Sequence, residues 1–97
     1  MSLDFVPTGI ATGISGTLMG TEVVTTIAAA GRYIVPAGVY YLYAVGANCQ
    51  LQVLNSAGVW QNVFAAGVGG LIASEGTNVG VVNNGAGNQT VTTQKLG

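Results

Sequence analysis

The 97-residue chain contains no histidine, one cysteine, and only two basic and three acidic side chains. Metal clusters, histidine-based catalytic triads and paired-carboxylate acid–base sites each need several such groups brought together. The composition therefore predicts a protein that is not an enzyme and that holds no metal or other cofactor. The single cysteine, Cys49, cannot form an internal disulfide and is expected to be a free thiol.

Cations and long apolar runs are also scarce, and each absence excludes a class of partner. Arg32 and Lys95 are the only basic residues, whereas nucleic acid binding requires several cations on one face. The best apolar run, residues 34–45, contains proline and glycine and is shorter than the roughly 20 residues of a membrane span. Residues 1–5 lack the cationic start of a signal peptide, which predicts synthesis in the cytoplasm.

Valine, threonine and glycine dominate what is present, and good helix formers are few. Turn signals recur about every 8–12 residues, a spacing typical of β-sandwiches, jelly rolls and small barrels. We therefore predict an all-β fold of seven or eight short strands, a single β-sandwich or jelly-roll-like domain. The expected strands cover residues 21–28, 31–35, 39–45, 49–54, 59–64, 71–73, 77–82 and 90–96.

The clearest local signal is a β-hairpin in the middle of the chain. Residues 49–54 alternate apolar and polar side chains, residues 55–58 form an Asn- and Gly-containing turn, and residues 59–64 return. The alternation places Leu51 and Val53 toward a core, with the glutamines on the opposite face. In the return strand Trp60 and Phe64 are expected to share a face, so the hairpin is predicted to be covered on both sides.

The first part of the chain is interrupted by glycine every three or four positions. We expect residues 1–20 to form an extended N-terminal arm or an edge strand, and residues 21–97 to form the sandwich domain. Leu3, Phe5 and Val6 precede the glycine-rich stretch and form an apolar group near the chain end. Such a group predicts an arm that docks on a neighbour, for example by adding to its sheet.

Aromatic residues are the remaining candidates for a binding role. Tyr41, Tyr43 and Trp60 are predicted to pack between strands or between chains. Tyr40 and Tyr41 must point to opposite sides of one strand, so the tyrosines cannot all belong to one flat platform for a sugar. Cys49 has no neighbouring base or cation to activate it, which predicts a small core or half-exposed side chain rather than a nucleophile.

With so few charges, the exposed surface must consist largely of Thr, Asn, Gln, Ser and Gly. A neutral surface with unpaired strand edges favours contact with other chains. Assembly covers those edges and lets a small domain bury apolar surface that it cannot bury alone. These features predict an oligomeric subunit of a larger particle.

Two segments resemble small virion proteins of tailed bacteriophages. Residues 35–41 read VPAGVYY, and residues 50–63 read QLQVLNSAGVWQNV. In those proteins a PAG-x-Y strand leads to an LQ-V strand, a glycine turn and a W-x-x-V strand; the turn here lacks the Asp usual in that pattern. The opening residues 1–3 and the closing residues 95–97 share the resemblance.

The resemblance implies a β-sandwich decoration or cement protein on the capsid exterior. It also implies a homotrimer, made in the bacterial cytoplasm, that binds the major capsid protein or another virion protein. Related domains occur in head fibres and tail parts, so the alternative is a fibre or tail-associated adhesin module that binds host-surface glycan. Neither the strand order nor the oligomer number can be derived from periodicity, because periodicity is a local property.

Overall fold

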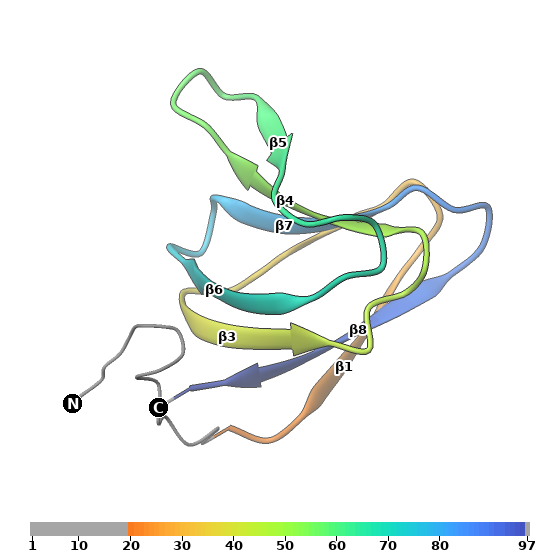
Figure 1. The fold of residues 1–97 in the computed structure, drawn as a ribbon, viewed down its shortest axis with the longest axis horizontal. Helices are drawn as coiled ribbons and strands as arrows, with labels where there is room; N and C mark the ends of the chain where they lie inside the picture. Colours follow the sequence, from red (N-terminus) through yellow and green to blue (C-terminus); the bar gives the residue numbers. More distant parts are fainter. Residues whose placement is uncertain (1–19, 97) are drawn as a thin grey trace.

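Eight β-strands and no helix make up residues 20–96, the part of the chain that the computed structural model describes (Figure 1). The strands are β1 (Val23–Ile27), β2 (Arg32–Ile34), β3 (Gly38–Tyr43), β4 (Cys49–Leu54), β5 (Trp60–Asn62), β6 (Gly70–Ser74), β7 (Val79–Asn83) and β8 (Gln89–Lys95). The predicted all-β class is confirmed. No helix in this part of the chain is long and apolar enough to cross a membrane.

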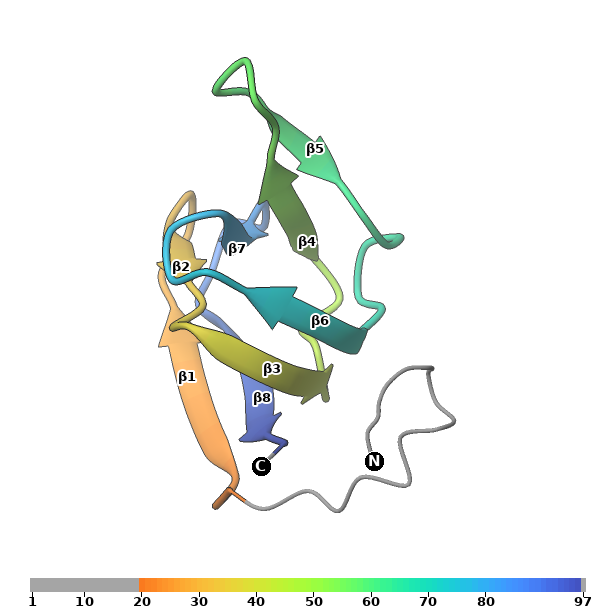
Figure 2. The ribbon, with the colours of Figure 1, turned by 90° about the vertical axis from the view of Figure 1, so that its left-hand side faces the viewer.

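The strands form two four-stranded antiparallel sheets that pack together as two layers (Figure 2). The first sheet has the order β1-β8-β3-β6, and the second has the order β2-β7-β4-β5. The first strand pairs with the last, the second with the seventh, the third with the sixth and the fourth with the fifth. The first four strands therefore pair with the last four in reverse order, as in one long hairpin folded over on itself. The β3–β8 pair completes the first sheet, and the β4–β7 pair completes the second.

The predicted central hairpin is present, with its turn at residues 55–58. The Asn55 side-chain oxygen accepts hydrogen bonds from the backbone N–H groups of Ala57 (2.9 Å) and Val59 (3.0 Å). Gly58 adopts a φ of 80°, a left-handed conformation that glycine takes without steric cost. The return strand β5 is shorter than expected, and Phe64 lies beyond its end, where the ring packs against the core. The prediction that Phe64 shares a face with Trp60 is wrong for this reason.

A second predicted turn, at residues 36–38, has a different role from that of the hairpin. The strands on its two sides, β2 and β3, belong to different sheets, so this exposed turn carries the chain from one sheet to the other. Val35 lies fully buried at the crossing, and its N–H donates to the Val79 carbonyl (2.9 Å). Its carbonyl accepts a 2.7 Å hydrogen bond from the Ser74 hydroxyl. These bonds satisfy the backbone where the chain leaves one layer for the other.

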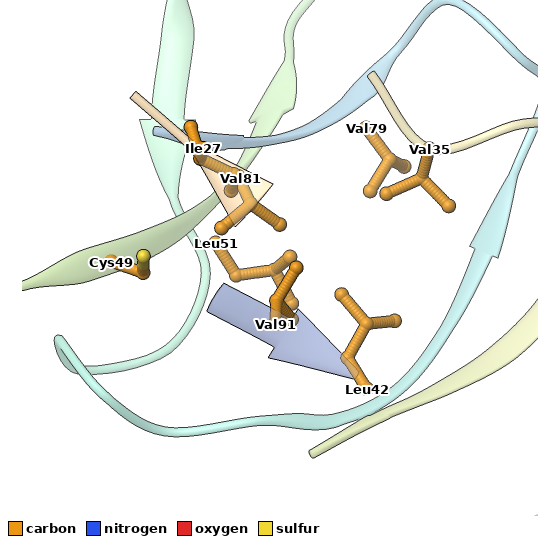
Figure 3. Close-up of a cluster of buried hydrophobic side chains, with 8 residues drawn as sticks. All are labelled: Ile27, Val35, Leu42, Cys49, Leu51, Val79, Val81 and Val91. Carbon is orange, nitrogen blue, oxygen red and sulfur yellow. The ribbon is translucent and has the colours of Figure 1, made fainter. Parts of the chain in front are cut away.

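The core lies between the two sheets and is built from both (Figure 3). Its buried apolar residues are Ile27, Val35, Leu42, Cys49, Leu51, Val79, Val81 and Val91. The burial of Leu51 confirms the predicted orientation of β4, in which Leu51 faces the core and the glutamines lie on the opposite face. Cys49 is a free, fully buried thiol, and burial raises its pKa, so it fills space as a small apolar side chain.

Candidate interaction surfaces

Tyr41 and Tyr43 lie side by side on the outer face of the first sheet. They occupy alternate positions of β3, and their rings stack with centroids 5.2 Å apart and an interplanar angle of 20°. Tyr40 points the other way and packs against the core, as the alternation predicts. We define the tyrosine face as Val24, Val39, Tyr41, Tyr43 and Leu71, which share this side of the sheet by register. Its exposed members include Val24, at 64%, and Tyr41, at 38%.

A hydrogen-bond network ties the beginning of the described chain to the tyrosine face. The Tyr43 hydroxyl donates to the Glu22 carboxylate and lies 3.4 Å from the Gln94 side-chain oxygen. The Gln94 amide donates to the Gly20 carbonyl at 2.9 Å, and the Gly20 N–H donates to the Lys95 carbonyl at 2.9 Å. The bond to Glu22, together with burial, raises the pKa of Tyr43 to about 12. The phenol is therefore neutral and acts as a hydrogen-bond donor at physiological pH.

Trp60 and Arg32 meet on the outer face of the second sheet, although they come from its two edge strands. The Arg32 guanidinium carbon lies 4.5 Å from the centre of the Trp60 ring, within the range of a cation–π contact. Gly80, on β7, one of the two strands between them, permits this approach. A Cβ at Gly80 would lie 3.1 Å from Arg32 Cδ and 3.3 Å from Trp60 Cη2. The two side chains thus cover a glycine in the middle of the sheet.

Amide side chains extend this cluster along the same face. Arg32 donates to the Gln52 side-chain oxygen at 2.8 Å, and the Gln52 amide donates to the Asn62 side-chain oxygen at 2.9 Å. Gln50 donates to the backbone carbonyl of Phe64. We call Arg32, Gln52, Trp60 and Asn62 the tryptophan face. Its one charged group is paired with a ring and an amide, so the face presents mostly neutral hydrogen-bonding groups.

The structure separates the residues that the sequence singled out. Tyr41 and Tyr43 stack on one outer surface, whereas Trp60 lies on the opposite outer surface of the two-layer fold. Leu3, Phe5 and Val6, the predicted docking group, lie outside the described residues. The aromatic residues therefore belong to two surfaces rather than one.

Sequence reasoning missed the role of Arg32. The wide spacing of Glu22, Arg32 and Glu75 along the chain predicts only solvated side chains or one inter-strand pair. The partners of Arg32 are instead an aromatic ring and an amide whose residue is twenty positions away along the chain. The one feature of the sequence that indicates the contact is Gly80, which leaves room for both side chains. It can be interpreted in this way only when the order of the strands is known.

Both surfaces are suited to contact with another macromolecule through apolar area and neutral hydrogen bonds. Within residues 20–96, no three His, Cys, Asp or Glu side chains gather where they could hold a metal ion. Comparisons with protein-family models, with curated proteins and with solved structures found no match.

Proposed function

We propose that this chain is a structural protein of a tailed bacteriophage that decorates the capsid exterior and stabilises the shell. In this proposal the protein is made in the cytoplasm of the host bacterium and assembles on the virion. It binds the major capsid protein or another virion protein as a homotrimer, and it requires no cofactor, nucleic acid or membrane. Its role is non-enzymatic, because binding alone joins neighbouring shell subunits against internal pressure.

The neutral surface is the observation that carries this proposal. The tyrosine face exposes aromatic and valine side chains with Glu22 at its margin, and the tryptophan face carries a single paired cation. Surfaces of this kind gain little from solvation and much from contact. Because an oligomer presents several copies at once, a modest interface on each copy is enough to hold it on a repeating shell.

We also propose that the two layers form a jelly roll with an N-terminal arm at residues 1–20. The pairing of first with last strand, second with seventh, and so on inward supports the jelly roll, an eight-stranded fold used by viral capsid and lectin domains. In this proposal Leu3, Phe5 and Val6 dock on a neighbouring subunit. Fold alone does not establish function, so the proposal depends on the surfaces.

The test is binding to capsids that have been purified without this chain. The protein is added at increasing ratios, and bound copies are measured by sedimentation and located by electron microscopy. We expect saturation at a fixed number of copies, density on the outside of the shell, and release of the genome at a higher temperature. Failure to sediment with the capsids, or density confined to the interior, would contradict the proposal.

Variants on the two faces make the capsid experiment more specific. Tyr41→Ala with Tyr43→Ala removes the exposed aromatic stack, and Trp60→Ala makes a comparable change on the opposite surface. If one face contacts the shell, one of these variants lowers the bound fraction while the other leaves it unchanged. Thermal unfolding of each variant separates a lost contact from a lost fold.

A glycan-binding adhesin module remains the alternative, and one observation favours it. Trp60 shares its face with the Gln52 and Asn62 amides, a combination of flat ring and neutral hydrogen-bonding groups that suits a sugar. Titration with host-surface polysaccharide tests this function. Saturable binding that Trp60→Ala abolishes and Tyr41→Ala preserves would support the adhesin and count against the capsid proposal.

A further inference from the structure

The two sheets have four outer edges, and three of them carry features that discourage the addition of another strand. β2 and β5 have three residues each, and β2 contains Arg32 with Pro36 close behind it. β6 begins with glycine and is followed by Glu75. Short length, charge and proline are the devices by which proteins protect sheet edges.

β1 carries fewer of these protections, because the charge beside it, Glu22, stands before the strand and the strand itself is uninterrupted. Its five residues read Val-Val-Thr-Thr-Ile, without charge, proline or glycine. Within residues 20–96 it pairs with β8 alone, so its other edge presents backbone N–H and C=O groups that have no strand partner. Val23 is 51% exposed and Val24 is 64% exposed, so apolar side chains on both faces of the strand accompany the open edge.

We infer that β1 is a self-association edge, at which β1 of a second copy of this chain pairs antiparallel about a two-fold axis centred on Thr25. In this register Val23 lies opposite Ile27 of the second copy, and Val24 lies opposite its Thr26. These are β-branched pairs of the kind that stabilise antiparallel sheets. The first sheet of one copy and the first sheet of the other then form one continuous eight-stranded sheet.

Charge favours this pairing over the other combination that would extend the same sheet. If β1 of one copy joined β6 of another antiparallel and in full overlap, Glu22 would lie opposite Glu75. In the two-fold pairing Glu22 lies opposite Ala28 instead, and the two Glu22 side chains are at opposite ends of the interface. β1 itself contains no charged residue, so an isologous contact between identical copies places no like charges opposite each other.

The contact does not rest on the proposed capsid function. It involves Val24 at the margin of the tyrosine face and leaves the stacked Tyr41 and Tyr43 and the tryptophan face free. A two-fold contact is compatible with a separate three-fold contact elsewhere on the chain. In that case the soluble particle contains six copies, and loss of the β1 contact leaves three. Without a three-fold contact the soluble particle contains two copies, and loss of the β1 contact leaves one.

The experiment uses pairs of complementary charges in the full chain. One variant carries Val24→Lys with Thr26→Lys, and the other carries Val24→Glu with Thr26→Glu. Because position 24 faces position 26 of the second copy, each variant alone places like charges opposite each other. An equimolar mixture places lysine opposite glutamate at all four positions. Val39→Lys with Thr90→Lys, on the same side of the interior strands, is the matched control.

Light scattering gives the mass of each species relative to the 9.7 kDa chain, and circular dichroism confirms that each variant is folded. We expect an even number of copies for the wild-type chain and the control, half that number for each charged variant, and recovery of the full number in the mixture. A wild-type monomer or trimer, variants of unchanged mass, or a mixture that fails to recover would overturn the inference. A trimeric wild type would overturn it while leaving the capsid proposal intact.

Discussion

At the scale of single residues, Asn83 shows how a polar side chain can be required inside an apolar fold. It is fully buried at the end of β7, and its amide donates hydrogen bonds to the carbonyls of Ile27 and Gly87, both at 2.8 Å. Its oxygen accepts a 2.8 Å hydrogen bond from the Gly85 N–H. One side chain thus joins the end of β1 to the turn between β7 and β8, which no apolar residue could do.

Replacement of Asn83 by alanine is expected to be strongly destabilising. It leaves two carbonyls and one N–H without their partner in a buried site, so we expect a loss of about 3 kcal/mol in the free energy of unfolding. Urea denaturation measures the change, and Asn84→Ala, at the exposed neighbouring position, should alter stability by less than about 0.5 kcal/mol. Equal effects of the two substitutions would show that the buried network contributes little.

Tyr43 predicts a pH dependence of stability whose sign follows from its pKa. Folding raises this pKa from 10.0 to about 12, mainly through the hydrogen bond to Glu22. The stabilisation is therefore fully present below pH 10 and is lost as the pH rises from 10 to 12. Tyr43→Phe removes this component, so its unfolding free energy should fall less steeply over that range than that of the wild-type chain.

The Glu22→Gln variant tests the stated cause of the shift. Loss of the carboxylate charge should return the pKa of Tyr43 toward 10, which an ultraviolet titration of the phenols detects as earlier ionisation. Parallel stability curves for the wild-type chain and Tyr43→Phe, or an unchanged titration in Glu22→Gln, would refute this account of the network.

At the scale of elements, the turn between β4 and β5 depends on the backbone of Gly58. Its φ of 80° is left-handed, and a Cβ there would meet nothing within 4 Å. Gly58→Ala therefore tests conformation alone, and we expect a loss of about 1 kcal/mol in unfolding free energy. Gly87 has equally open surroundings without a left-handed φ, so Gly87→Ala should leave stability unchanged or slightly higher. Equal costs at both positions, measured by urea denaturation, would contradict the role assigned to the turn.

The positions of most strands were predictable because alternation and turn residues act locally. Residues 49–54 form β4 as expected, and the opposed directions of Tyr40 and Tyr41 follow from the two-residue period. The sheets were not predictable, since the turns at 36–38 and 55–58 carry similar signals, yet one crosses between layers and the other closes a hairpin. The contact of Arg32 with Trp60 was not predictable for the same reason, because a local sequence pattern does not show which strands belong to the same sheet.

At the scale of the whole molecule, the core is small relative to the surface. Among residues 20–96, eight buried apolar side chains fill the space between the sheets, and as many large hydrophobic residues are exposed. Chains of this length bury only about 60–65% of the surface of the open chain, so their stability alone is modest. The exposed residues, Val24 and Tyr41 among them, are available for contacts between copies, and such contacts add to the stability of the folded state.

The contact that we infer at β1 predicts a melting temperature that depends on protein concentration. When folding and pairing of two chains are linked, a tenfold rise in concentration adds about 1.4 kcal/mol to the unfolding free energy of the pair. For two chains of this size that free energy corresponds to about 3 °C in Tm. Differential scanning calorimetry over a hundredfold range of concentration measures the shift.

The variant with Val24→Lys and Thr26→Lys should lose the part of the shift that arises at β1, whereas the control with Val39→Lys and Thr90→Lys should keep it. A Tm that is constant with concentration in the wild-type chain would show that each copy is stable alone, and that the exposed apolar residues are not covered by another copy.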